Sequence, residues 1–112
     1  MTWEEVVAIG LELPEVEEST SYGRPALKVR GKFFAGFNTK EKAVVLKLAT
    51  IEDQSFLIEA GPRVYYITDH YKGWPSVLAR PGKLTAKECR ARLEDAWRLA
   101  APKTLVKKYD SR

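Results

Sequence analysis

The only histidine of this chain lies in the stretch TDHYKGWPSVL, which covers residues 68–78. It stands close to a lysine and two large aromatic side chains. Histidine titrates near neutral pH, lysine contacts phosphate and aromatic rings stack on bases, so the stretch has the residue types of a nucleic-acid contact. The same rings can instead close one end of a small fold, with their polar groups reaching water or backbone. The candidate binding residues here are His70, Tyr71, Lys72 and Trp74.

A second candidate surface lies in the basic stretch SYGRPALKVRGKFFAGF, which covers residues 21–37. Lys28 and Arg30 alternate with apolar residues, so we expect both to project from the same side of one strand. Lys32 follows just past a glycine turn, and Lys47 lies on the next predicted strand. If these strands are neighbours, four cations share one face with phenylalanines between them, as in a generic nucleic-acid surface. The alternative is that the phenylalanines form core and the cations face only water.

No catalytic or metal-binding pattern accompanies these residues. His70 has no second histidine, and Cys89 is the only cysteine, so a cysteine-rich zinc site is excluded. Cys89 falls on the apolar stripe of a predicted helix, where a buried thiol is expected. The chain has no GxSxG, GxxxxGK[ST] or GxGxxG motif. We therefore expect a protein without catalysis, cofactor or metal.

The composition is that of one small globular domain. With 112 residues the chain can bury one core, and its 45% hydrophobic and 30% charged residues favour folding over disorder. No apolar run of about 18 residues is present, so no membrane span is predicted. The beginning of the chain is acidic and amphipathic, unlike a signal peptide. We expect a cytoplasmic monomer with a reduced cysteine.

The net charge of +4 is unevenly distributed along the chain. Residues 1–23 contain six acidic residues and no lysine or arginine, so all 19 basic residues lie in the remainder. A basic body of this kind can attract a polyanion such as DNA, although surface lysines and arginines also maintain solubility. The acidic beginning fits a solvated helix start, favoured by the helix dipole, better than a cation-binding ridge.

Secondary-structure signals divide the first half of the chain into one helix and three strands. Thr2 and Glu5 fit a capping box, and the helix they begin is expected to end at Pro14. The polar stretch 15–21 is predicted to be a loop. Alternating apolar residues then indicate strands over residues 26–30, 32–37 and 44–48, with a tight turn at Gly31 between the first two.

The second half is predicted to hold two helices, two strands and a short terminal helix. Thr50 caps a helix over residues 51–60. Strands over residues 64–68 and 76–80 flank the TDHYKGWPSVL link. Thr85 and Glu88 fit another capping box ahead of a long helix that Pro102 ends, and residues 103–109 add a short helix. The order indicates one α+β domain over residues 1–112, with an antiparallel sheet of about five strands and helices packed on one face.

Three motifs in combination resemble the MmcQ/YjbR family of small bacterial proteins. They are SYGRPA ahead of the basic hairpin, HYKGWPSVL in the second hairpin and DAWRLAAPK near the end, within a likeness that extends from TWEEVVAIGLELPEVEE to Leu105. The family's motif positions in this sequence are Ser21, Tyr22, Gly23, Pro25, Ala26, His70, Tyr71, Gly73, Pro75, Val77, Leu78, Trp97, Ala101, Pro102 and Lys103. Ser76 is smaller than the aromatic residue often expected there, which argues against stacking at that position.

The resemblance implies a CyaY-like α+β fold and a DNA-binding role through a double wing of hairpins. It brings no catalytic residues. Frataxin-like proteins share the fold and use an acidic ridge for iron, but the basic hairpin here would work against cation capture. We therefore expect weak, non-specific DNA binding, mostly through phosphates, by Lys28, Arg30, Lys32, Lys47, His70, Tyr71, Lys72 and Trp74.

The rival hypothesis is a small-ligand or protein-interaction module without catalysis. In it, Tyr22, Tyr71 and Trp74 line a pocket between the hairpins, and the basic residues recognise an anionic ligand or partner. The two hypotheses differ in geometry, because the aromatic side chains either converge on a cavity or lie on an open basic face.

Overall fold

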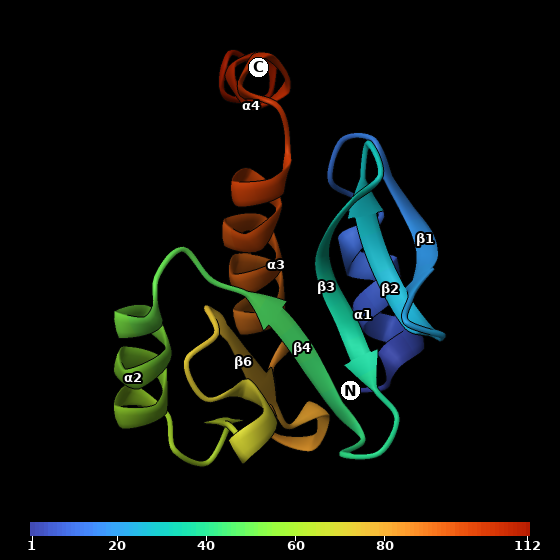
Figure 1. The fold of residues 1–112 in the computed structure, drawn as a ribbon. Helices are drawn as coiled ribbons and strands as arrows, with labels where there is room; N and C mark the ends of the chain where they lie inside the picture. The colour runs from blue at the N-terminus through green and yellow to red at the C-terminus, as the bar shows by residue number, and fades with distance from the viewer.

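An antiparallel sheet of six strands lies at the centre of the computed structural model, which describes residues 1–112 (Figure 1). The strand order across the sheet is β1-β2-β3-β4-β6-β5. The strands are β1 (Val16–Ser21), β2 (Arg24–Val29), β3 (Lys32–Asn38), β4 (Ala43–Lys47), β5 (Tyr65–Tyr66) and β6 (Ser76–Ala79). The helices are α1 (Trp3–Gly10), α2 (Ile51–Ala60), α3 (Ala86–Ala100) and α4 (Lys103–Asp110). The predicted α+β class is confirmed, with one strand more than expected.

Helices α1 and α3 cover one face of the sheet and lie behind it in the view of Figure 1. The core between these layers is made of alternate strand residues, such as Leu27 and Val29 of β2, and of Leu93 and Trp97 of α3, all fully buried. The alternation of β2 is the one that the sequence predicted. α2 packs against β5 and β6 at one end of the sheet, and α4 continues beyond the end of α3.

Capping residues begin α1 and α2 where the sequence predicted. The Thr2 hydroxyl accepts a hydrogen bond from the Glu5 amide, the Glu5 carboxylate accepts one from the Thr2 amide, and the same box forms at α2. α1 ends at Gly10 rather than at Pro14. The Leu13 amide donates to the Gly10 carbonyl three residues earlier, which tightens the chain and carries Leu13 into the core, where it is buried.

The stretch that was predicted as a loop, residues 15–21, contains the edge strand β1. Its sequence, VEESTS, has no apolar alternation, so no periodic signal marks it as a strand. The strand forms because Tyr22 and Gly23 make a two-residue turn that folds the segment onto β2, with Ser21 opposite Arg24. Pairing with β2 therefore overrides a local sequence that favours a loop.

Both hairpins in the β1–β3 half of the sheet turn through a non-glycine residue of positive φ followed by glycine. Tyr22 and Gly23 have φ of 52° and 78°, and Arg30 and Gly31 have φ of 48° and 79°. Positive φ at both central residues is the geometry of a type I′ turn, which suits the twist of antiparallel strands. Tyrosine and arginine carry a steric cost in this region. Arg30 therefore belongs to the turn and does not extend the alternation of β2, contrary to its predicted place beside Lys28.

We expect Tyr22→Asn to raise the free energy of unfolding by about 0.5–1 kcal/mol, because asparagine adopts the left-handed region more readily than tyrosine. The Tyr22 side chain is fully exposed, so its removal costs no packing. Urea unfolding would measure the change, with Tyr22→Ala as the control that removes the ring and keeps the strain. Equal stability of the two variants would show that this turn stores no strain.

Candidate functional site

The sheet surface opposite α1 and α3, called here the open face, carries part of the predicted basic surface. Lys28 of β2 is the register partner of Phe33 on one side and of Glu17 on the other, and directly opposed residues share a face. Phe33 is half-buried, so it exposes part of its ring beside Lys28. Phe34, by contrast, is fully buried in the core, and Phe37 packs its ring against Trp3 of α1.

In the β1–β3 half of the sheet, the residues in the middle of the open face have small side chains. Successive register partners across the sheet form one row, Ser19, Ala26, Gly36, Val45, Leu78 and Tyr66. A Cβ on Gly36 would lie 2.8 Å from the Phe33 ring and 3.1 Å from the Pro25 carbonyl oxygen. Glycine is therefore required for the Phe33 ring to lean over this row.

The four cations predicted to share one face are not gathered in one place. Lys28 and Lys47 both lie on the open face, but Lys47 is opposite Ser76 of β6, in the other half of the sheet. Lys32 is exposed at the hairpin end, opposite the core residue Val29. The fourth cation, in the β2–β3 turn, points to a carboxylate.

That cation is Arg30, which forms an ion pair with Glu15. Its Nε donates to Glu15 Oε1 at 2.8 Å, and a terminal nitrogen donates to Oε2 at 3.2 Å. The hydrogen bond from Arg30 holds the pKa of the Glu15 carboxyl below its usual value, and Lys108 of α4 lowers that pKa further. The charge of Arg30 is thus offset by a carboxylate, whereas the charges of Lys28, Lys32 and Lys47 are not paired.

The link between β5 and β6, residues 67–75, does not project as the wing that the resemblance implied. The predicted strand over residues 64–68 shortens to the two residues of β5, because the chain then leaves the sheet and forms a 3₁₀ turn, η1 (Asp69–Tyr71). The Lys72 amide donates to the Asp69 carbonyl and closes this turn. The link therefore lies folded beside the sheet instead of extending two long strands away from it.

A buried glutamine of α2 holds the link in place. Gln54 Nε2 donates to the carbonyl oxygens of Tyr71, Trp74 and Ser76 at 3.2, 3.0 and 2.8 Å. Gln54 is only 4% exposed, so these bonds form where water does not compete. One amide group thus sets the path of two link residues and of the first residue of β6.

The four candidate side chains of the link divide into one that closes the fold and three that face water. Tyr71 is half-buried, and its hydroxyl accepts from Nδ2 of buried Asn38 at 2.8 Å. His70, Lys72 and Trp74 are exposed, with 67% of Trp74 accessible to solvent. Tyr71 thus closes one end of the fold, which was one of the two interpretations of this stretch. His70, Lys72 and Trp74 are exposed, as a nucleic-acid contact requires.

Arginine and lysine play different parts on this surface. All five ion pairs are made by four arginines, Arg30, Arg90, Arg92 and Arg98. None of the eleven lysines is paired with a carboxylate. Sequence reasoning assigned no binding role to α4, which adds three unpaired lysines beyond the end of α3; the only signal was the excess of basic residues toward the end of the chain.

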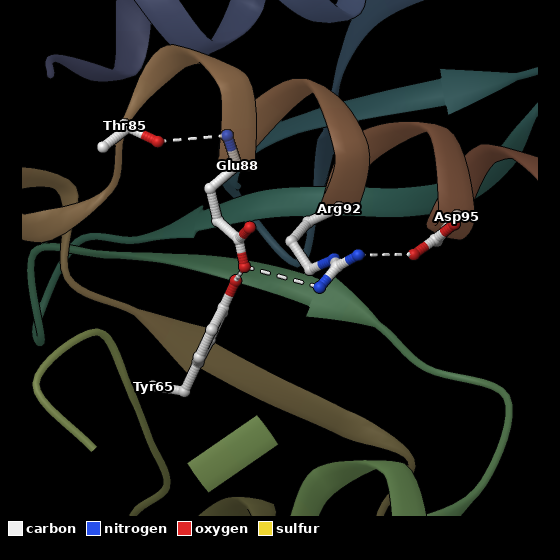
Figure 2. Close-up of polar contacts among 5 residues, drawn as sticks. All are labelled: Tyr65, Thr85, Glu88, Arg92 and Asp95. Carbon is white, nitrogen blue, oxygen red and sulfur yellow. Dashed lines mark hydrogen bonds and ion pairs between the residues drawn. The ribbon is translucent and has the colours of Figure 1, made fainter. Parts of the chain in front are cut away.

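A polar network that sequence reasoning did not predict joins β5 to α3 (Figure 2). The Tyr65 hydroxyl donates to Glu88 Oε2 at 2.5 Å, and Arg92 donates to the same oxygen at 3.4 Å and to Asp95 at 3.0 Å. Thr85 accepts from the Glu88 amide, but the carboxylate of Glu88 faces Tyr65 and does not return to Thr85, so only half of the predicted capping box forms. Burial and Glu88 raise the pKa of Tyr65 well above its usual value.

The network lines a hollow on the surface, and a second hollow lies between α3 and α4. A groove of about 290 Å³ between α2, β5 and α3 is lined by Phe56, Leu57, Ala60, Gly61, Val64, Tyr65, Lys83, Thr85, Glu88 and Arg92. A hollow of about 440 Å³ between α3 and α4 is lined by Arg98, Ala101, Lys103, Val106, Lys107, Asp110 and Ser111. Tyr22, Tyr71 and Trp74 line neither hollow, because Tyr22 sits at the β1–β2 turn and the other two lie on the link.

The remaining chemical groups are placed as follows. Cys89 is buried on α3, and burial raises the pKa of its thiol to about 11, so the thiol is protonated at neutral pH. No three side chains of His, Cys, Asp or Glu form a group that could hold a metal ion. None of the helices has the length and apolar character needed to cross a bilayer.

Comparison with known proteins identifies the family. The family model YjbR matches residues 11–99, a range that includes every strand and nearly all of α3. The chain belongs to the YjbR family. The resemblance drawn from the SYGRPA, HYKGWPSVL and DAWRLAAPK motifs is thereby confirmed, while α4 lies outside the range that the YjbR model matches.

Relatives of this YjbR domain include two mycobacterial proteins and one solved structure. Uncharacterized protein Rv2570 of Mycobacterium tuberculosis is 36% identical over 53 residues, which are 47% of this chain and 41% of that protein. Uncharacterized protein Mb2600 of Mycobacterium bovis matches to the same extent. The matched region thus covers less than half of the length of each of these relatives.

The crystal structure of Deinococcus radiodurans protein DR2400, which has the family-model domain DUF419, matches this chain with a TM-score of 0.73. The match covers 96% of this chain and 86% of that one, at 18% sequence identity. A likeness at this identity shows that the two share a fold, and a shared fold does not assign a function.

We expect Gln54→Leu to lower the free energy of unfolding by about 1–3 kcal/mol, because it leaves the carbonyls of Tyr71, Trp74 and Ser76 without their donor. Urea unfolding would measure the loss, and hydrogen exchange would show faster opening of residues 67–75. Ser55→Ala, an exposed change one residue away on α2, is the matched control. Unchanged exchange in the link would contradict the role given to Gln54.

We expect Tyr65→Phe to lower the free energy of unfolding by about 1–2 kcal/mol at pH 7, because Glu88 loses its hydroxyl donor. Since the folded pKa of Tyr65 is raised, its contribution is complete below about pH 10, the pKa of an unfolded tyrosine, and declines as pH rises toward the folded value. The native chain should therefore lose more stability than the variant above pH 10.

Denaturant unfolding at pH 7 and above pH 10 would test this difference. Tyr22→Phe is the matched control, because Tyr22 is fully exposed and makes no side-chain hydrogen bond. The same alkaline loss in the native chain and in Tyr65→Phe would rule out a contribution from Tyr65.

Proposed function

We propose that this YjbR domain binds nucleic acid weakly and without sequence preference, mostly through phosphates, and that it has no catalytic role. The contacts come from Lys28 and Lys47 on the open face, Lys32 at the β2–β3 turn and Lys72 on the link. His70 and Trp74 stand beside Lys72. The proposal includes a monomer that works in the cytoplasm.

The observation that supports this proposal best is that arginines make all of the ion pairs and lysines make none. The carboxylates that approach cations are occupied by arginines, while the lysines remain unpaired. An unpaired ammonium group that meets a phosphate displaces a counterion condensed on the nucleic acid, and this release drives non-specific binding. An arginine that is already paired must give up its carboxylate first.

Because Arg30 is already paired, its proposed role differs from the phosphate contact that the sequence predicted. Its bidentate pair with Glu15 makes it a support for the turn that presents Lys32, rather than a primary phosphate contact. Tyr71 likewise supports the link through Asn38. Trp74 is the aromatic side chain of the link that remains available to stack on an unpaired base.

The rival small-ligand hypothesis receives less support from the geometry. It requires Tyr22, Tyr71 and Trp74 to converge on one cavity. Tyr22 is at the tip of the β1–β2 hairpin with its side chain fully exposed, while Tyr71 is closed against Asn38. An open surface with separated aromatic groups suits an extended polyanion better than a compact ligand.

Fluorescence anisotropy with labelled single- and double-stranded DNA, at about 50 and 200 mM salt, tests the proposal. We expect the double variant Lys28→Ala, Lys47→Ala to bind all sequences more weakly and to reduce the slope of log K against log salt by about 2, because each lysine neutralises one phosphate. Arg30→Ala should change the slope less than Lys28→Ala or Lys47→Ala made singly. Trp74→Ala should weaken single-stranded binding more than double-stranded binding.

Lys87→Ala is the matched control, because Lys87 is an exposed lysine of α3, on the other side of the sheet. A change of slope in Lys87→Ala equal to half that of the double variant would show that net charge, and not this surface, governs binding. No binding at low salt, or a loss that depends on DNA sequence, would refute the proposal.

A further inference from the structure

β1 is the one long free edge of the sheet. It stands at one end of the strand order and pairs only with β2, while β5 at the opposite end has two residues. Figure 1 shows β1 as the outermost strand, with no other segment beyond it. The free side of an edge strand presents N–H and C=O groups that can pair with another extended segment.

The hairpin geometry identifies which groups of β1 point outward. In a two-residue hairpin the residues that flank the turn, Ser21 and Arg24, form a hydrogen-bonded pair, and such pairs recur at every second position. The hydrogen-bonded positions of β1 are therefore Ser21, Ser19 and Glu17. Glu18 and Thr20 alternate with these positions, so their N–H and C=O groups point away from β2. Thr20 is opposite Pro25, which has no N–H and fits this non-bonded position. No backbone hydrogen bond outside the sheet ladder involves Glu18 or Thr20.

The side chains around this edge favour a basic partner. β1 has no lysine, proline or bulge to block pairing, and its charges are Glu17 and Glu18, both exposed and neither in an ion pair. Adjacent strand residues point to opposite faces, so the two carboxylates flank the edge on both sides. Tyr22, fully exposed at the end of the strand, offers a ring to a cation.

We propose that β1 accepts an extended lysine- or arginine-rich segment of a partner protein as a seventh strand. Backbone bonds to Glu18 and Thr20 hold the segment, and its basic side chains lie opposite Glu17 and Glu18. Residues 1–23 contain no lysine or arginine, so the only cations in register with β1 are Arg24 and Lys28, which lie on β2 at its inner side. The backbone groups that face outward here belong to Glu18 and Thr20, whereas Lys28, the nearest lysine of the proposed nucleic-acid contact, lies on the inner side of β1, opposite Glu17.

A second copy of this chain fits the edge less well. Antiparallel pairing of two β1 strands would bring the Glu17 and Glu18 carboxylates of both copies into one interface. Like charges opposite one another destabilise a strand pair. The acidic edge therefore disfavours self-pairing and favours a partner of opposite charge.

The test uses the full chain and two blocked synthetic peptides that differ only in charge, TVKKVTV and TVEEVTV. Amide hydrogen exchange followed by NMR reports on individual residues. We expect TVKKVTV to protect the Glu18 and Thr20 amides, which exchange freely without peptide, and to leave the Ser19 amide, already bonded to β2, unchanged. TVEEVTV should protect neither.

Thr20→Pro removes one outward N–H and leaves the β1–β2 ladder intact, whereas Thr20→Val keeps that N–H and serves as the matched control. We expect TVKKVTV to bind the proline variant on the order of tenfold more weakly and the valine variant as tightly as the native chain. A native-like amide spectrum outside β1 confirms that each variant folds. The double variant Glu17→Lys, Glu18→Lys gives an independent measurement, since it should prefer TVEEVTV.

Selective protection by TVKKVTV, together with the weaker binding to Thr20→Pro, supports the proposal. Equal binding of both peptides, or no protection of Glu18 and Thr20 at millimolar peptide, overturns it. Protection that grows with protein concentration in the absence of peptide would assign the edge to a second copy and also overturn it. Failure of this proposal is distinguishable from failure of DNA binding, because the peptides are titrated without DNA and the two Thr20 variants change no charge.

Discussion

The buried indole of Trp97 joins the elements on which both candidate surfaces depend. It is fully buried on α3, and its Nε1–H donates to the Pro14 carbonyl at 3.0 Å. Its ring packs edge-to-face with that of Tyr109 of α4, with the two ring centroids 5.0 Å apart. Leaving that donor unpaired in the core would cost about 1–3 kcal/mol, so the Pro14 carbonyl is held where the indole can reach it. Because β1 begins two residues after Pro14, this bond determines where the edge strand joins the sheet. Through Tyr109, the same side chain places the basic helix α4.

Sequence signals predicted correctly those elements whose determining contacts are made by residues close together in the sequence. The capping residues Thr2 and Thr50 predicted where α1 and α2 begin, because the side chain that caps a helix is adjacent to it in sequence. The alternation of β2 and β4 predicted which residues face the core. β1 could not be predicted in this way, because its polar sequence becomes a strand only when Tyr22 and Gly23 turn it back onto β2. The path of the link after β5 was equally hidden, because it depends on Gln54, at least 17 positions away from the carbonyls it binds.

The candidate surface was predicted in its residue types and only partly in its arrangement. A sequence gives the number of charges along a chain, but it does not give the partner of each charge. Lys28 and Arg30 look equivalent in the sequence, yet the type I′ turn directs Arg30 to Glu15 and leaves Lys28 unpaired. The planar guanidinium suits such bidentate pairing, whereas the compact and strongly hydrated ammonium of lysine tends to remain in water. This chemical difference explains why arginines support the fold and lysines remain available at its surface.

The register of β1 and β2 sets the border between the two charged regions. Glu17 lies directly opposite Lys28, so the first acidic residue of the edge strand faces a lysine of the open face. Directly opposed residues of paired strands lie closer together than the Debye length of about 8 Å at physiological ionic strength. The Glu17 carboxylate therefore reduces the positive potential around Lys28. The positive region of the open face therefore weakens at β2 and changes sign at β1. A polyanion is directed away from the free edge by the same carboxylates that attract a basic segment, so the sheet can present two surfaces of opposite preference on neighbouring strands.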